Sequence, residues 1–129
     1  MATVAVLGGG SFGTAMANMI AANGHAVTLW MRDPANAERT QQSRRNSDYL
    51  PDYPLVDGLL VSADLNSALA AAEVIFFAVP SKALRSLARA VAPLASSDAG
   101  LVSMAKGIEP ESFLLPSRRQ RFKYQQSMG

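Results

Sequence analysis

The sequence of 129 residues contains no cysteine, a single histidine and a single tryptophan. Without cysteine the chain can form no disulfide, and thiolate catalysis and cysteine-based zinc sites are excluded, which fits a reducing compartment. No apolar run approaches the ~18 residues needed to cross a bilayer, and no basic segment precedes an apolar stretch at the start. We therefore expect no membrane span, no signal peptide and no metal site, and we predict a cytoplasmic location.

Charge is sparse and unevenly distributed along the chain. Charged residues make up 17% and hydrophobic residues 49% of the sequence, which is typical of one globular domain. The net charge is +2, but four of the 12 Lys and Arg residues lie in residues 116–129, a segment without acid, which leaves eight basic and ten acidic residues in residues 1–115. We interpret residues 1–115 as the folded domain and residues 116–129 as a basic, disordered tail, and we expect no nucleic-acid partner.

The most informative stretch is an apolar run at residues 3–7 that leads into Gly8, Gly10 and Gly13. In a strand–turn–helix context, Gly8 allows a sharp turn, Gly10 lets a diphosphate approach the backbone, and Gly13 lets the helix pack closely on the strand. Small residues follow as far as Asn23, where Gly24 ends the predicted helix. This pattern predicts a dinucleotide site with the phosphates at the helix N-terminus, where N–H groups and the helix dipole favour anions.

Apolar runs alternate with helical patterns along the rest of the chain. Strands are predicted at residues 3–7, 25–30, 59–63, 73–80 and 100–104. Helices are predicted at residues 11–23, 34–45, 65–72 and 82–92, the last three with Asp33, Asp64 and Ser81 as N-caps, and residues 46–58 are predicted to form a loop. This alternation predicts the α/β class, as a doubly wound parallel sheet of Rossmann type. The one histidine, His25, opens a strand and is interpreted as structural rather than catalytic.

Two basic residues follow predicted strands at the sheet edge where the ligand would bind. Arg32 stands about 20 residues beyond the glycines, where an NAD site usually has an acidic side chain and an NADP site an arginine. We therefore favour NADP over NAD, the alternative being a solvent-facing Arg32 that pairs with Asp33 or Glu38. Lys106 follows the last predicted strand, and its ammonium could sit beside a phosphate or a developing alkoxide. A solvated surface lysine is the alternative for Lys106.

Further motifs point to one enzyme family. They are residues 8–15, residues 23–30, Asn46 with Tyr49-Leu50-Pro51, Val79-Pro80-Ser81, and Lys106-Gly107-Ile108-Glu109. In this order they resemble bacterial NAD(P)-dependent glycerol-3-phosphate dehydrogenase, over about residues 3–115. The resemblance implies cytoplasmic reduction of dihydroxyacetone phosphate, a small-molecule substrate, to sn-glycerol 3-phosphate for phospholipid synthesis.

The same resemblance implies roles for individual residues. Ser11 and Phe12 would contact the cofactor at the glycine turn, Arg32 would meet the adenosine ribose or its phosphate, and Lys106 would touch both cofactor and substrate. Members of the family carry the general-acid lysine on a second, helical domain, so we assign no catalytic residue to this sequence. A non-catalytic dinucleotide-binding module is the alternative function, and the sequence does not decide the oligomeric state.

Overall fold

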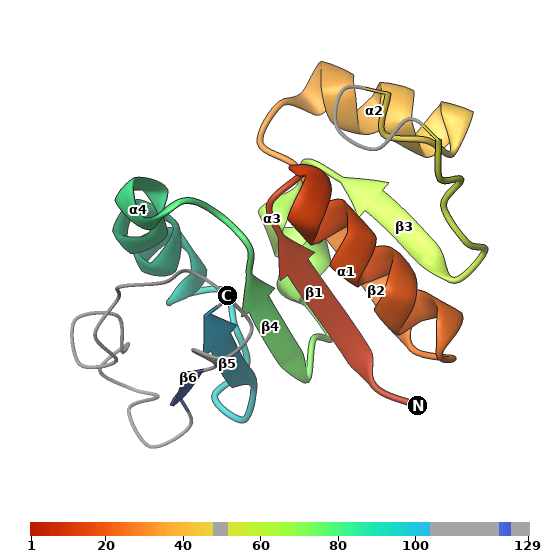
Figure 1. Ribbon diagram of the computed structural model, residues 1–129. Helices are drawn as coiled ribbons and strands as arrows, with labels where there is room; N and C mark the ends of the chain where they lie inside the picture. Colours follow the sequence, from red (N-terminus) through yellow and green to blue (C-terminus); the bar gives the residue numbers. More distant parts are fainter. Residues whose placement is uncertain (48–51, 104–121, 125–129) are drawn as a thin grey trace.

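The structure, a computed structural model, describes residues 1–47, 52–103 and 122–124 (Figure 1). Strands and helices alternate through most of the chain, as predicted. In chain order the elements are β1 (Thr3–Leu7), α1 (Ser11–Ala22), β2 (Ala26–Trp30), α2 (Pro34–Ser43), β3 (Leu59–Ser62), α3 (Leu65–Leu69), β4 (Val74–Phe77), α4 (Ser81–Val91), β5 (Gly100–Ser103) and β6 (Phe122–Tyr124). No helix among the described residues is long and apolar enough to traverse a bilayer.

All neighbouring strands run parallel, in the order β3-β2-β1-β4-β5-β6. β1 lies between β2 and β4, with Leu7 opposite Trp30 on one side and opposite Phe77 on the other. The chain therefore builds one half of the sheet through β3 and then crosses back to β4 on the other side of β1. This confirms the predicted doubly wound sheet of Rossmann type.

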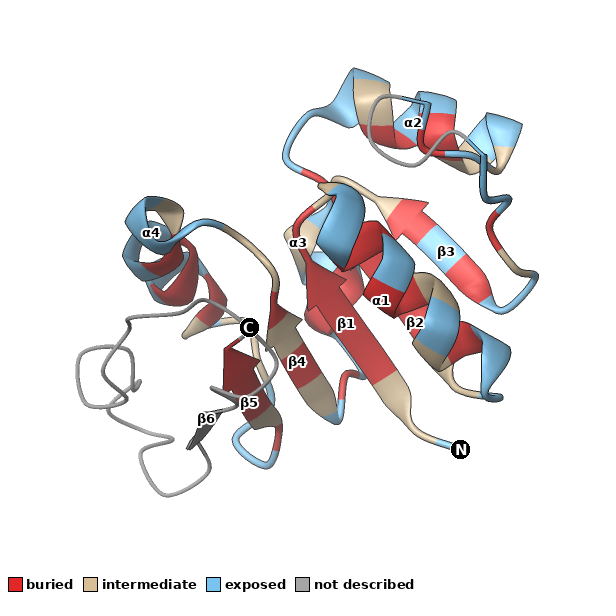
Figure 2. Ribbon diagram, in the orientation of Figure 1, coloured by how far each residue is buried: buried red, intermediate tan, exposed pale blue. Residues whose placement is uncertain are grey.

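The apolar core lies on both faces of the sheet, because successive side chains of a strand point to opposite faces. Val4 and Val6 of β1 pack in the cluster that includes α1 and α2, whereas Ala5 and Leu7 pack in the cluster that includes α3 and α4. Figure 2 shows β1 buried along most of its length. Burying a Leu or Val side chain stabilises the fold by about 1.5–3 kcal/mol, so this doubly covered strand anchors the structure.

The helix starts agree with the predicted caps at two of three positions. Asp33 accepts a hydrogen bond from the backbone N–H of Ala35 (3.1 Å), and Asp64 accepts one from Asn66 (3.1 Å). The prediction that Ser81 caps the next helix is wrong, because Ser81 is its first residue and Pro80 is the N-cap. Proline fixes φ and supplies no side-chain acceptor, so it begins α4 through its backbone geometry alone.

β6 was not expected from the sequence. Phe122–Tyr124 pairs in parallel with β5, so three residues of the predicted disordered tail extend the sheet instead. The remainder of residues 116–129 lies outside the described residues, as does Lys106.

Candidate functional site

The glycine turn between β1 and α1 is packed so tightly that two of its positions admit no side chain. Gly8 has φ +134°, and a Cβ built there would overlap the carbonyl oxygen of Ala78. A Cβ at Gly13 would overlap the carbonyl oxygen of Gly8 and lie 3.2 Å from Ala78 Cβ. The sharp turn at Gly8 and the close packing of helix on strand at Gly13 are therefore confirmed as properties of this turn.

Gly10 occupies a different environment from these two glycines. It is the N-cap of α1, and a Cβ built on it would meet no heavy atom within 4 Å. No side chain caps α1, and its first turn contains no acidic residue. Ser11 and Phe12 are exposed beside Gly10, in that first turn. The helix start thus combines open space with the positive end of the helix dipole, which is the environment that an anion requires.

Arg32 lies beside this turn. The N–H of Gly8 donates to the carbonyl of Trp30 (3.0 Å), so the end of β2 is bonded directly to the turn, and Arg32 follows two residues later. Arg32 is exposed, and among the described residues no hydrogen bond or ion pair engages it. The alternative pairing with Asp33 or Glu38 is not formed in the structure, where the Asp33 carboxylate caps α2.

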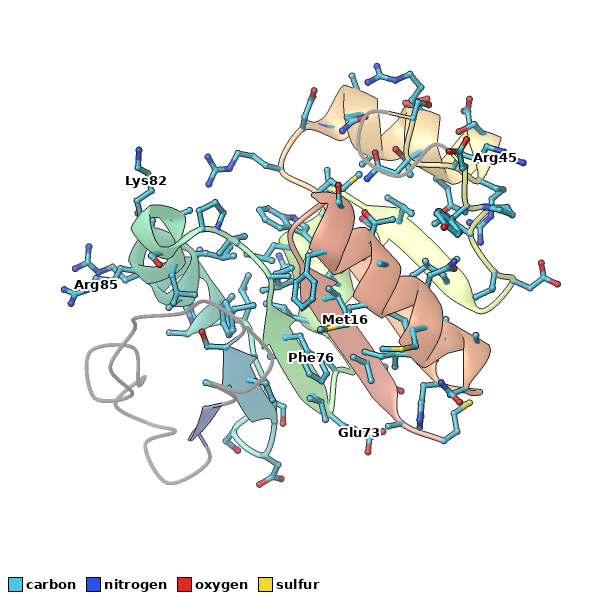
Figure 3. The ribbon with its side chains drawn as sticks, in the orientation of Figure 1. Met16, Arg45, Glu73, Phe76, Lys82 and Arg85 are labelled. Atoms are coloured by element: carbon cyan, nitrogen blue, oxygen red, sulfur yellow. The ribbon has the colours of Figure 1, made fainter. Side chains whose placement is uncertain are left out.

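The residues that follow β4 also reach the turn. The N–H of Ala78 donates to the carbonyl of Leu7 (2.8 Å), and Val79 Cγ1 would lie 3.1 Å from a Cβ at Gly8. Lys82, in contrast, projects outward from α4 together with Arg85 (Figure 3). The structure therefore brings together the glycines, Arg32 and the end of β4, and it directs Lys82 to solvent.

Two contacts of the turn could not be recognised from the sequence. A Cβ at Gly9 would lie 2.8 Å from Met31 Cε, so this glycine is also constrained. The side-chain amide of Asn46 donates to the carbonyl of Gly9 and to the hydroxyl of Thr14, both at 2.8 Å. The resemblance includes Asn46 but gives it no role, and neither local pattern nor periodicity indicates which residue a loop amide will reach 37 positions away.

His25 lies at the opposite end of the sheet. Its Nδ1 accepts a hydrogen bond from the backbone N–H of Ala2 (2.9 Å), before the start of β1. The Glu73 carboxylate accepts from the N–H of Thr3 (3.0 Å) at the same end, in the lower part of Figure 3. His25 is therefore structural, as interpreted from the sequence.

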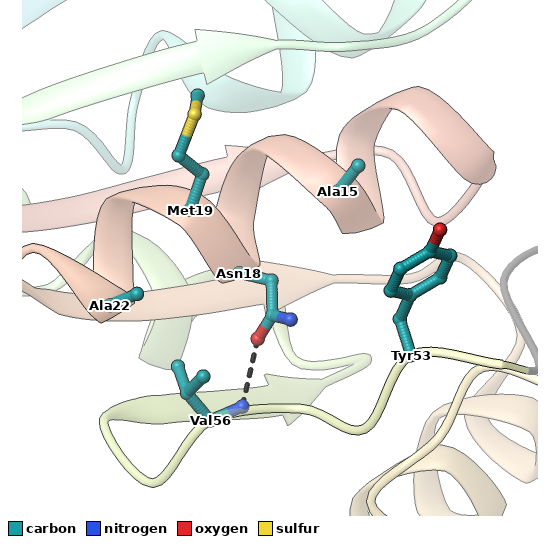
Figure 4. A pocket seen from close by; sticks show the side chains of 6 residues that line it. All are labelled: Ala15, Asn18, Met19, Ala22, Tyr53 and Val56. Carbon is teal, nitrogen blue, oxygen red and sulfur yellow. Dashed lines mark hydrogen bonds between the residues drawn. The ribbon is translucent and has the colours of Figure 1, made fainter.

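A groove of about 450 Å³ runs along the outer face of α1 (Figure 4). Its lining is mainly apolar and consists of Ala15, Asn18, Met19, Ala22, Tyr53 and Val56. Both ends of the Asn18 amide are engaged there, because it donates to the carbonyl of Pro54 (3.1 Å) and accepts from the N–H of Val56 (2.8 Å). The groove therefore presents no cationic group to a phosphate. Within the described residues no cluster of acidic or histidine side chains could hold a metal ion.

A parallel doubly wound sheet with a tight glycine turn and an uncapped helix at the end of its central strand defines the class of Rossmann-type nucleotide-binding domains. The comparison with known families is more specific. Residues 3–124 match the model of the NAD-dependent glycerol-3-phosphate dehydrogenase N-terminus, and the chain belongs to this family. The match extends beyond Leu115, where we expected the resemblance to end, and includes β6.

Individual relatives agree with this assignment. The chain is 55% identical to a glycerol-3-phosphate dehydrogenase (NAD(P)+) of Teredinibacter turnerae and 49% identical to one of Saccharophagus degradans, over 89% and 90% of its length. The crystal structure of glycerol-3-phosphate dehydrogenase from Coxiella burnetii superposes with a TM-score of 0.80 at 30% identity, covering 93% of this chain and 37% of that one. The chain spans about a third of the length of the curated relatives it matches, 34% and 32% respectively.

Proposed function

We propose that this chain binds NAD or NADP as the cofactor-binding part of a glycerol-3-phosphate dehydrogenase, which interconverts dihydroxyacetone phosphate and sn-glycerol 3-phosphate in the cytoplasm. The observation that carries the proposal is the contrast among the glycines. Side chains are excluded at Gly8 and Gly13 by the fold itself, whereas Gly10 faces open space at an uncapped helix start. A glycine that the fold does not require is best explained by a ligand that needs the room.

The residues at this turn fit a dinucleotide diphosphate. The first backbone N–H groups of α1, at Ser11 and Phe12, would face its oxygens, and the helix dipole would stabilise its negative charge. When bound, the nicotinamide ring supplies the hydride chemistry. The described residues would hold and orient the nucleotide at the carboxyl edge of the sheet.

We further propose that NADP is preferred over NAD. Arg32 is exposed at the end of β2 and has no competing partner among the described residues. A guanidinium can bind a 2′-phosphate through two parallel hydrogen bonds, which a ribose hydroxyl cannot match.

The assignments beyond the described residues rest on the resemblance. Lys106 is proposed to contact both the nicotinamide cofactor and the substrate. The dinucleotide-binding domain is proposed to occupy residues 1–115, with β6, from residues 116–129, added at the edge of its sheet.

Calorimetric titration of the 129-residue chain with NADPH and NADH tests the binding proposal. We expect both nucleotides to bind, NADPH more tightly. If neither reduced nucleotide binds to the folded chain, the proposal fails. If both bind equally, only the preference for NADP fails.

Turnover separates the enzymatic function from the alternative, a non-catalytic dinucleotide-binding module. The relatives are about three times as long as the chain, and a cofactor can react only when a substrate is oriented against it. We therefore expect the 129 residues alone to oxidise NADPH negligibly with dihydroxyacetone phosphate. A covalent extension by the C-terminal portion of the Teredinibacter turnerae relative should restore turnover. A chain that binds NADPH but stays inactive after this extension would favour the non-catalytic module.

A further inference from the structure

Asn46 is one of three polar residues among the described residues that are completely buried, together with Thr14 and Ser103. Its amide nitrogen donates to the carbonyl of Gly9 and to the hydroxyl of Thr14, which is also completely buried. Its amide oxygen is buried without any hydrogen-bond partner. Burying an unpartnered acceptor opposes folding, so fold stability alone does not explain an amide at this position.

The chain just before Asn46 is bonded to a later segment, residues 55–59. The Arg44 guanidinium donates to the carbonyls of Val56 (2.8 Å) and Leu59 (2.7 Å), and the carbonyl of Arg44 accepts from the N–H of Leu55 (2.8 Å). Asn18 of α1 binds the neighbouring backbone at Val56. The backbone that leads into Asn46 is therefore held by several hydrogen bonds, so the Asn46 amide can set the orientation of the group that it binds.

The contact with Gly9 determines how the peptide between Gly9 and Gly10 is oriented. A trans peptide is planar, and its carbonyl and N–H point in opposite directions. Asn46 holds the Gly9 carbonyl toward the buried side, so the N–H of Gly10 points the other way. Because both residues are glycines, no side chain would otherwise hinder rotation of this peptide, and the reversed orientation would aim a carbonyl oxygen at the anion.

We propose that Asn46 is a positioning residue, which fixes the Gly9–Gly10 peptide so that an N–H rather than a carbonyl faces the diphosphate of the nucleotide. This inference rests on the proposed function. It concerns the diphosphate alone. Substitution of Asn46 should therefore reduce the affinity for ligands that carry the diphosphate and leave the affinity for other fragments of the nucleotide nearly unchanged.

The test compares two fragments of NADP binding to the 129-residue chain. ADP-ribose carries the diphosphate without the 2′-phosphate, and adenosine 2′-monophosphate carries the 2′-phosphate without the diphosphate. Asn46→Asp retains the shape of the side chain but replaces the donor by an acceptor facing the Gly9 carbonyl. We expect this substitution to weaken the binding of ADP-ribose about tenfold or more, and that of adenosine 2′-monophosphate by less than about twofold. Calorimetry measures both affinities.

Asn18→Asp is the matched control, because Asn18 binds the same loop on the outer face of α1 and does not contact the turn. It should lower the melting temperature and leave the ratio of the two affinities unchanged. Should Asn46→Asp fail to fold, Thr14→Val removes one partner of the amide at constant shape, and Thr14→Ser restores it. Thr14→Val should weaken the binding of ADP-ribose by about threefold without weakening that of adenosine 2′-monophosphate, and Thr14→Ser should leave both affinities unchanged.

The outcomes separate the two proposals. Equal losses for both fragments, or no loss for either, in the folded variants would show that Asn46 is merely structural. Failure of the unmodified chain to bind NADPH and both fragments would instead overturn the proposed function, and the role of Asn46 with it.

Discussion

The two ends of the parallel sheet differ in whether side chains bind the backbone there. At the amino end, polar side chains bond to the backbone around the start of β1, since His25 accepts from Ala2 and Glu73 accepts from Thr3. At the carboxyl end, α1 begins at Gly10 with no side-chain cap, and a Cβ there would meet nothing. Polar side chains therefore bind the backbone at the amino end, whereas no side chain caps the helix that begins at the carboxyl end.

This difference separates polar residues with a structural contact from the residues of the candidate site, a separation that residue type alone does not give. Histidine and glutamate are frequent catalytic residues, yet here the side chains of His25 and Glu73 accept hydrogen bonds from backbone N–H groups. Glycine has no side chain to offer, yet three glycines form the candidate site. What marks the candidate site is a helix start without a side-chain cap, next to open space.

The largest effect is expected at Gly8. Gly8→Ala combines an unfavourable φ with overlap of the Ala78 carbonyl, and it should lower the free energy of unfolding by about 3 kcal/mol or more. Gly24→Ala is the matched control, because Gly24 also has a positive φ (+95°) but has nothing within 4 Å of a built Cβ, so the cost should be about 1–2 kcal/mol. Urea denaturation measures both. Equal costs would show that the turn tolerates a side chain.

Arg32→Ala tests the exposed cation at the carboxyl end. Loss of a charge-assisted contact should weaken NADPH binding by about 1.5–3 kcal/mol and leave NADH almost unaffected. Arg85→Ala provides the control, since Arg85 points outward from α4 (Figure 3). Calorimetry with both nucleotides gives the comparison, and equal losses would mean that Arg32 does not bind the 2′-phosphate.

Gly10→Ala should separate binding from stability. Because a Cβ there meets no protein atom, the free energy of unfolding should change by less than about 1 kcal/mol, the preference of the N-cap position for glycine over alanine included. The added methyl group would occupy the space of the diphosphate, and NADPH affinity should fall about tenfold, equivalent to about 1.4 kcal/mol. Unchanged affinity would place the diphosphate elsewhere.

His25→Ala is expected to have the smallest effect. It removes one hydrogen bond at the amino end, which should cost about 1 kcal/mol of stability, and it should leave the affinity for NADPH unchanged. Thermal unfolding and calorimetry on the same sample provide both values. A loss of NADPH affinity without a loss of stability would contradict the assignment of a structural role to the amino end and of nucleotide binding to the carboxyl end of the sheet.

Much of the fold followed from local patterns in the sequence. Continuous apolar runs predicted the buried parallel strands, and Asp33 and Asp64 marked two helix starts, because a short acidic side chain accepts from the next free N–H groups. The third cap was wrong because Ser81 and Pro80 are both suitable near a helix start, and the proline took the cap position. β6 was not predicted because it has only three residues and lies in a basic, polar stretch of sequence without a recognisable strand pattern.

The candidate site was only partly predictable. The glycine spacing identified Gly8 and Gly13, where the packing admits no Cβ, whereas the role predicted for Gly10 stays a prediction. The contacts of Gly9 with Met31 and Asn46 depend on how segments distant in the sequence pack together, which residue spacing does not indicate. The parts that remained hidden are long-range polar and packing contacts, which bring the loop after α2 to the turn.

The position of β1 in the middle of the sheet also has a consequence for biosynthesis. Glu73 contacts Thr3 across 70 residues, and the turn at Gly8 packs on Ala78, so β1 can pair with its second neighbour, β4, only after about 70 further residues have been made. Closing such long loops before any contact forms slows folding. On the ribosome, the glycine turn would therefore complete its packing only once residue 78 has emerged from the exit tunnel.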